Sequence, residues 1–101
     1  VVGLGGIFIE VFKDRKIRMA PVTEREADDM LQSLQSWPLL AGVRGKQPLD
    51  TSALRAVILA VSRLMDQCEF IEEIDLNPVI VHEKGVSIVD SRVFFTKPLQ
   101  A

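Results

Sequence analysis

The sequence predicts an α+β domain, within the broad α/β class, in which two helices pack on one face of a mostly antiparallel sheet. Two segments carry apolar residues at helical spacing, and after them the apolar period changes to two. The 101 residues suffice for one domain with a modest core, and 48% apolar with 26% charged residues is ordinary for a folded chain. We therefore treat residues 1–101 as one domain.

A glycine loop opens the chain and leads into two expected strands. Gly3-Leu4-Gly5-Gly6 precedes the apolar run 7–12, and residues 13–16 are expected to turn the chain into a second strand at 17–20, which Pro21 stops. The loop lacks the third glycine of a dinucleotide fingerprint and runs into a strand, which argues against a Rossmann domain. Two interpretations remain open: Gly5 and Gly6 let the backbone approach a phosphate, or they only form a turn.

Two helices are expected in the middle of the chain. Thr23 with Glu26 is a capping box, so the first helix begins there, and we expect Pro38 to end it. Its apolar face consists of Ala27, Met30, Leu31, Leu34 and Trp37. After a loop at 39–49, Asp50, Thr51 or Ser52 can cap a second helix. The apolar face of this helix consists of Leu54, Val57, Ile58, Val61, Leu64, Met65 and Cys68.

Three strands are expected to follow, at 71–76, 79–82 and 86–95, with a turn at 83–85. If the turn is centred on Glu83 and Lys84, Asn77 lies opposite Asp90, roughly 5 Å away between Cβ atoms. A bulge at Gly85 would instead shift the register by one residue.

This opposed pair is the first candidate for chemistry. An amide oxygen from Asn77 and a carboxylate from Asp90 are hard ligands suited to Mg²⁺, which takes its remaining ligands from water and substrate phosphates. Strand alternation places Glu73 and Asp75 on the same face as Asn77. The alternative is that Asn77 and Pro78 only mark the start of a strand and that Asp90 is a solvated polar residue.

Other residues give weaker indications of a functional site. Arg44-Gly45-Lys46 precedes a helix start and could bind an anion, but it departs from the P-loop pattern, and a solvated loop is the simpler interpretation. His82 has no Ser or Cys partner at a suggestive position, so we expect a surface residue. Cys68 and Trp37 are expected in the core.

Composition excludes several function classes. The formal net charge of −2, with no run of Lys or Arg, does not favour binding to nucleic acid or to an anionic membrane. The single cysteine excludes an intrachain disulfide and suits a reducing cytosol, so we expect a cytoplasmic protein. The apolar stretch 1–12 is short and interrupted by Glu10, unlike a membrane span or a signal peptide.

Taken together, the segments resemble the C-terminal part of the ATP-grasp domain in ADP-forming acetyl-CoA synthetases and their succinyl-CoA synthetase relatives. Three ordered motifs carry this resemblance over nearly the whole chain. They are Gly3 to Val11 with Asp14 and Ala20-Pro21, Leu40 to Gly45 with Asp50, and Glu73-Ile74-Asp75-Leu76-Asn77-Pro78-Val79-Ile80-Val81 followed by Val89-Asp90.

The resemblance implies the C-terminal half of an ATP-grasp fold and assigns roles to single residues. Asn77 and Asp90 match the residues that hold the Mg²⁺ of ATP or ADP in this family. Asp75 matches an acidic position beside the metal, linked to the phosphohistidine segment, and Glu73 matches a second acidic residue of the catalytic site. The expected nucleotide-binding residues are Gly5, Gly6, Glu10 and Arg44.

The resemblance also implies a reaction, in which acyl-CoA, ADP and phosphate give the free acid, CoA and ATP through an acyl phosphate and a phosphohistidine. The partners would be the remaining half of the ATP-grasp fold and a CoA-binding domain or subunit that carries the phosphohistidine. We therefore expect this chain, which begins without Met inside a glycine loop, to be a fragment with no turnover by itself.

Two alternatives remain open at this stage. The same module could serve as a regulatory acyl-CoA-synthetase-like region of a protein lysine acetyltransferase. It could also be a plain interaction module whose acidic residues form a solvated face.

Overall fold

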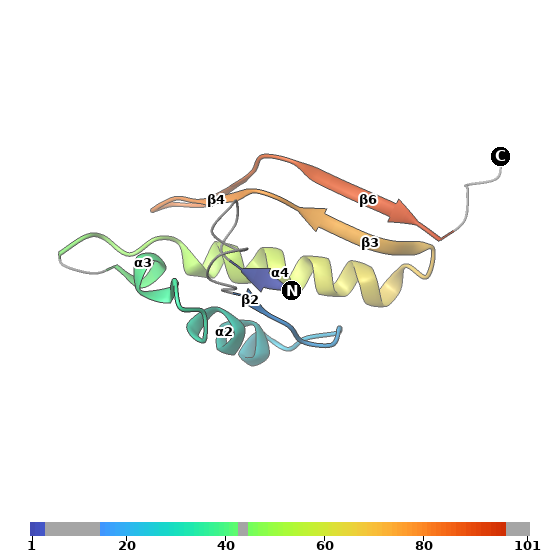
Figure 1. Cartoon of the computed structure of the whole chain (residues 1–101), viewed down its shortest axis with the longest axis horizontal. Coiled ribbons are helices and arrows are strands. Elements are labelled where there is room, and N and C mark those ends of the chain that lie inside the picture. Colours follow the sequence, from blue (N-terminus) through green and yellow to red (C-terminus); the bar gives the residue numbers. More distant parts are fainter. Residues whose placement is uncertain (4–14, 43–44, 97–101) are drawn as a thin grey trace.

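The computed structural model describes residues 1–3, 15–42 and 45–96. Strands β3, β4 and β6 lie on one side of the long helix α4, and helix α2 lies on the other side (Figure 1). The described elements are β1 (Val2–Gly3), β2 (Arg15–Lys16), α2 (Glu24–Gln32), α3 (Trp37–Ala41), α4 (Thr51–Gln67), β3 (Ile71–Leu76), β4 (Val79–Val81), β5 (Val86–Ile88) and β6 (Ser91–Phe95). All strand pairs are antiparallel, so the predicted α+β class is confirmed, with a short third helix that was not expected.

The N-terminal strand pair differs from the expectation. Val2 pairs with Lys16 and Gly3 with Arg15, so residues expected in a loop and a turn form β1 and β2. Residues 17–20, expected as a strand, have no regular secondary structure. The expected strand at 7–12 lies outside the described residues.

The capping box of α2 is confirmed. The Thr23 hydroxyl accepts the Glu26 backbone N–H at 3.1 Å, and the Glu26 carboxylate accepts the Thr23 N–H at 3.1 Å. The predicted end of this helix was wrong, because α2 stops at Gln32 and Pro38 lies in the first turn of α3. A proline is tolerated there because the first N–H groups of a helix have no intrahelical partner.

Helix α4 holds the layers together. Its Leu54 is buried against α2, and its Arg55 approaches Asp28 of α2 at 3.2 Å. The hydroxyl of Ser62, which is only 7% exposed, accepts the Val22 backbone N–H at 2.7 Å just before α2. The predicted apolar face of α4 is covered only in part, since Leu64 is 47% exposed.

The core lies between the helices and the β4–β5 hairpin. Leu31, Leu34 and Leu54 are buried together, and the half-buried residues packed against them are Val2, Trp37, Leu40, Ile58, Val79, Val81 and Val86. Trp37 therefore contributes to the core as predicted, whereas Cys68 at the end of α4 is only half-buried.

In the part of the chain that the structure describes, no helix has both the length and the apolar character needed to cross a membrane.

Replacing Leu31 by alanine tests this core. Leu31 is 1% exposed, so Leu31→Ala should leave a cavity and lower the free energy of unfolding by about 2–5 kcal/mol. Urea denaturation followed by circular dichroism measures the change. The matched control is Leu39→Ala on α3, where the side chain is 65% exposed and the expected effect is within about 0.5 kcal/mol. Equal losses in the two variants would contradict the placement of the core.

Candidate functional site

One continuous register runs along the two C-terminal hairpin arms. Val79 faces Ile88 and Val81 faces Val86 in the β4–β5 pair, while Asp75 faces Arg92 in the β3–β6 pair. Between them, the backbone N–H of Asn77 donates to the carbonyl of Asp90 at 3.1 Å. The turn contains Gly85 at φ 84° without a shift of register, so the bulge considered from the sequence does not occur. The predicted opposition of Asn77 and Asp90 is confirmed.

The ladder changes its pattern at this pair. In a regular antiparallel ladder, hydrogen-bonded pairs of residues alternate with pairs that are not hydrogen-bonded. Here the neighbouring pair, Pro78 and Val89, also has one hydrogen bond, from the Val89 N–H to the Pro78 carbonyl at 3.0 Å. Pro78 has no N–H to donate, and its peptide bond with Asn77 is cis. Because Pro78 cannot donate to the ladder, the strand predicted at 86–95 is divided into β5 and β6 here.

The division places both members of the pair on the solvent side. Asn77 and Pro78 are consecutive exposed residues between the half-buried Leu76 and Val79, whereas the other arm is exposed throughout residues 87–96. In a regular strand, consecutive side chains would point to opposite faces. The arm that carries Asn77 therefore skips one step of the alternation at the point where the candidate ligands lie.

The two acidic candidates continue this row along β3. Glu73 and Asp75 are exposed, while Ile74 and Leu76, which alternate with them, are half-buried, as the alternation predicts. Glu73 lies opposite Phe94, next to a register irregularity at Ile71. The structure thus brings together Glu73, Asp75, Asn77 and Asp90. The other candidates, Gly5, Gly6, Glu10 and Arg44, lie outside the described residues.

The donor set of the pair fits a hard divalent cation. One oxygen of the Asp90 carboxylate accepts the Ser91 backbone N–H at 2.9 Å, which orients the group. An amide oxygen and a carboxylate, both exposed, leave room for water and phosphate oxygens, the ligands with which Mg²⁺ completes its coordination. No group of three or more His, Cys, Asp or Glu in the described ranges could hold a metal by itself. A cation at this pair would therefore take further ligands from elsewhere.

Asp50 connects the hairpin turn to α4. Its carboxylate accepts the Ala53 N–H at 3.0 Å as the N-cap and the Gly85 N–H at 2.7 Å. Its own N–H donates to the His82 carbonyl at 2.7 Å. The hydrogen bonds from Gly85 and Ala53 lower the pKa of Asp50 from 3.8, against the opposing effect of burial. The sequence indicated Asp50 only as one of three possible caps.

His82 is exposed, as predicted, but it does have a serine partner. Its Nε2 lies 2.8 Å from the Ser87 hydroxyl. Because Ile80 faces Ser87, His82 is the diagonal neighbour of Ser87 on the same face of the hairpin. The register alone could have found this pair.

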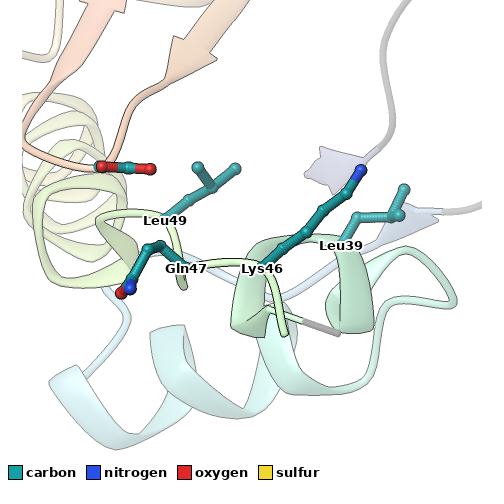
Figure 2. Close-up of a pocket in the computed structure, with 5 residues that line it drawn as sticks. Leu39, Lys46, Gln47 and Leu49 are labelled. Atoms are coloured by element: carbon teal, nitrogen blue, oxygen red, sulfur yellow. The ribbon is translucent and has the colours of Figure 1, made fainter. Parts of the chain in front are cut away.

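A hollow of about 390 Å³ lies beside the turn of the same hairpin, where Glu83 lines it, and its lining includes neither Asn77 nor Asp90. Figure 2 shows Leu39, Lys46 and Leu49 extending to the same side, with Gln47 pointing away from them. The residues that line the hollow are Leu39, Lys46, Gln47, Leu49 and Glu83. Lys46, one of the residues considered as an anion-binding loop, lines this hollow, and Arg44 lies outside the described residues.

Comparison with known proteins identifies the family of this chain. The family described as an ATP-grasp domain matches residues 1–95. The beta subunit of an ADP-forming acetate–CoA ligase II from Pyrococcus furiosus is 45% identical over 94 residues, covering 90% of this chain and 40% of that subunit. An ADP-forming 4-hydroxybutyrate–CoA ligase from Nitrosopumilus maritimus is 45% identical over 95 residues, covering 92% of this chain and 14% of that protein. The chain thus spans well under half the length of either relative.

Solved structures share the fold. A crystal structure from Pyrococcus horikoshii Ot3 has a TM-score of 0.85 at 43% identity, covering 96% of this chain and 41% of that one. An acetyl-coenzyme A synthetase of Ca. Korarchaeum cryptofilum, in complex with coenzyme A and Mg-AMPPCP, has a TM-score of 0.85 at 40% identity, covering 92% of this chain and 44% of that one. In that complex the phosphohistidine segment points towards the nucleotide binding site.

Changing Asp50 to asparagine tests its connection with the hairpin. Since the folded pKa of Asp50 lies below 3.8, its ionised form stabilises the fold fully above that pH and progressively less as the pH falls towards the folded pKa. Asp50→Asn should therefore be less stable than the parent chain at pH 7, by an amount that shrinks below about pH 4. Urea denaturation between pH 3 and pH 7 measures this difference.

The matched control for this test is Asp66→Asn, an exposed position late in α4. The stability of Asp66→Asn should differ from that of the parent chain by about the same small amount at pH 3 and at pH 7. A loss of stability in Asp50→Asn that is the same at pH 3 and pH 7 would contradict the role of the Asp50 charge.

Proposed function

This chain belongs to the ATP-grasp domain family, and we propose that it forms the metal-holding, C-terminal part of the nucleotide site of an ADP-forming acyl-CoA synthetase. The observation that carries this proposal is the opposition of Asn77 and Asp90 on the exposed side of the hairpin. The similar ligases are ADP-forming enzymes that act on acetate and 4-hydroxybutyrate, which supports the acyl-CoA class of substrate.

In this proposal Asn77 and Asp90 bind the Mg²⁺ of ATP or ADP. The backbone bond between them sets their spacing, and the Ser91 N–H sets the orientation of the Asp90 carboxylate. A bound Mg²⁺ would neutralise charge on the nucleotide phosphates during phosphoryl transfer. The expected nucleotide contacts outside the described residues are Gly5, Gly6, Glu10 and Arg44.

The acidic row on β3 is proposed to receive the phosphoryl-carrying segment. Asp75 lies two positions before Asn77, about 7 Å along the strand, and is exposed on the same side. Its carboxylate can accept an N–H of an incoming imidazole and hold the ring next to the phosphates. Glu73 extends the same row by one further step. The phosphohistidine segment of the Korarchaeum synthetase, which points towards the nucleotide, supports this arrangement.

The whole reaction needs more protein than this chain contains. The proposed reaction is acyl-CoA with ADP and phosphate giving acid, CoA and ATP, with the phosphoryl group carried by a histidine of a CoA-binding domain or subunit. The chain covers 40% of one relative and 14% of another, so the first half of the ATP-grasp site and the histidine would come from the remaining length. We propose that residues 1–101 have no turnover alone and that the complete enzyme is cytoplasmic.

The site is tested in the full-length protein that contains this chain. ATP formation from ADP, phosphate and a panel of acyl-CoAs should fall roughly a hundredfold or more in Asn77→Ala and in Asp90→Asn, because each removes one of two protein ligands to the metal. Titration with Mg²⁺ should show a higher half-saturating concentration in both variants. Asp66→Asn is the charge-matched control and should retain activity.

The outcomes separate the parts of the proposal. ATP formation that survives both substitutions would support synthetase activity but refute the proposal that Asn77 and Asp90 bind the metal. A protein that binds acyl-CoA but forms no ATP would refute the synthetase and favour a regulatory module.

A further inference from the structure

Arg92 is a cation on the same sheet face as the proposed metal pair. It lies on β6 directly opposite Asp75. Directly opposed side chains in an antiparallel pair have Cβ atoms roughly 5 Å apart on one face of the sheet. Arg92 is therefore in the row next to Asn77 and Asp90.

The position of Arg92 relative to Asp90 follows from their spacing along the chain. Arg92 is two residues after Asp90, which places it on the same face about 7 Å further along. A guanidinium on its long side chain can therefore reach a group bound between Asn77 and Asp90. The two carboxylates and the guanidinium thus border one exposed patch.

Arg92 is not engaged by its opposed carboxylate. Among the described residues, the ion pairs are those that Arg55 forms with Glu24 and Asp28, and none joins Arg92 to Asp75. The side chain of Arg92 is exposed, as are those of Asp75 and Asp90. Its five N–H donors are therefore available to an anion that comes from outside the described chain.

We propose that Arg92 binds the phosphoryl group that is transferred at this site. The inference rests on the proposed function and extends it, since it adds a fixed cation to the metal. A planar guanidinium can donate two parallel N–H bonds to a phosphoryl group, which gives orientation as well as charge. The phosphoryl group is either the terminal phosphate of a nucleoside triphosphate or the phosphate carried by a protein histidine.

A competing role for Arg92 is purely structural, as a partner that holds Asp75 across the strands. An exposed cross-strand charge pair contributes little, because solvent screens it. In that role Arg92 would not distinguish ligands that differ only in the terminal phosphoryl group. This difference makes the two roles separable.

The test compares two nucleotides in the full-length protein at saturating Mg²⁺. Isothermal titration calorimetry gives the dissociation constants of Mg-AMPPCP, a triphosphate analogue, and of Mg-ADP. Arg92→Gln should weaken Mg-AMPPCP binding roughly tenfold or more, as expected for the loss of a charge-assisted hydrogen bond, and change Mg-ADP binding less than about twofold. Arg92→Lys should retain part of the affinity. Arg63→Gln, an exposed arginine on α4, should change neither.

A second arm identifies the source of the phosphoryl group. Single-turnover transfer from the phosphorylated protein to ADP is measured for the parent, Arg92→Gln and Arg92→Lys. Unchanged AMPPCP binding with transfer slowed at least tenfold, and partly restored by lysine, assigns the contact to the histidine-borne phosphate. Unchanged binding and unchanged transfer would overturn the inference.

Two further outcomes separate this inference from the function on which it rests. If the parent protein binds neither nucleotide, the proposed nucleotide site itself fails. If Asp75→Asn abolishes the effect of Arg92→Gln on both AMPPCP binding and transfer, Arg92 acts through Asp75 and the phosphoryl contact is refuted.

Discussion

The carboxylate of Asp50 fixes the relation between the helical layer and the hairpin that carries the site. It caps α4 through the Ala53 N–H and holds the turn through the Gly85 N–H at 2.7 Å. In a hairpin, a slip of one residue would move every side chain of one arm to the other face. Holding the turn at Gly85 therefore keeps Asn77 opposite Asp90, although these residues lie at the other end of β4 and β5.

The interruption at Pro78 gives this region of the sheet its chemical character. Regular pairing would send alternate side chains towards the core, yet Asn77 and Pro78 are both exposed, and Asp90 lies on an arm that is exposed throughout residues 87–96. The missing N–H of Pro78 leaves the Pro78–Val89 pair with one bond, and the Asn77–Asp90 pair also has one. The two arms therefore remain hydrogen-bonded to each other while Asn77 and Asp90 face solvent, where a cation with water and phosphate ligands has room.

Similarity to known enzymes and the geometry of the chain support the proposal in different ways. The relatives identify the family and suggest the class of reaction, but this chain covers only 40% of the length of one and 14% of the other. The geometry concerns only residues present here, and it places four acidic or amide side chains and one arginine on a single exposed face. A phosphoryl group needs such a combination of metal ligands and a fixed cation to offset its charge.

Short-range features were determined by the sequence alone. The capping box of Thr23 and Glu26 and the opposition of Asn77 and Asp90 each depend on a few neighbouring residues or one turn. Only the tertiary structure decided the second bond of Asp50, to a residue 35 positions away, and the bond of Ser62 to Val22, 40 positions away. Periodicity carries no information on such pairs, because they form where distant segments meet, and there each hydrogen bond offsets the cost of removing its polar groups from water.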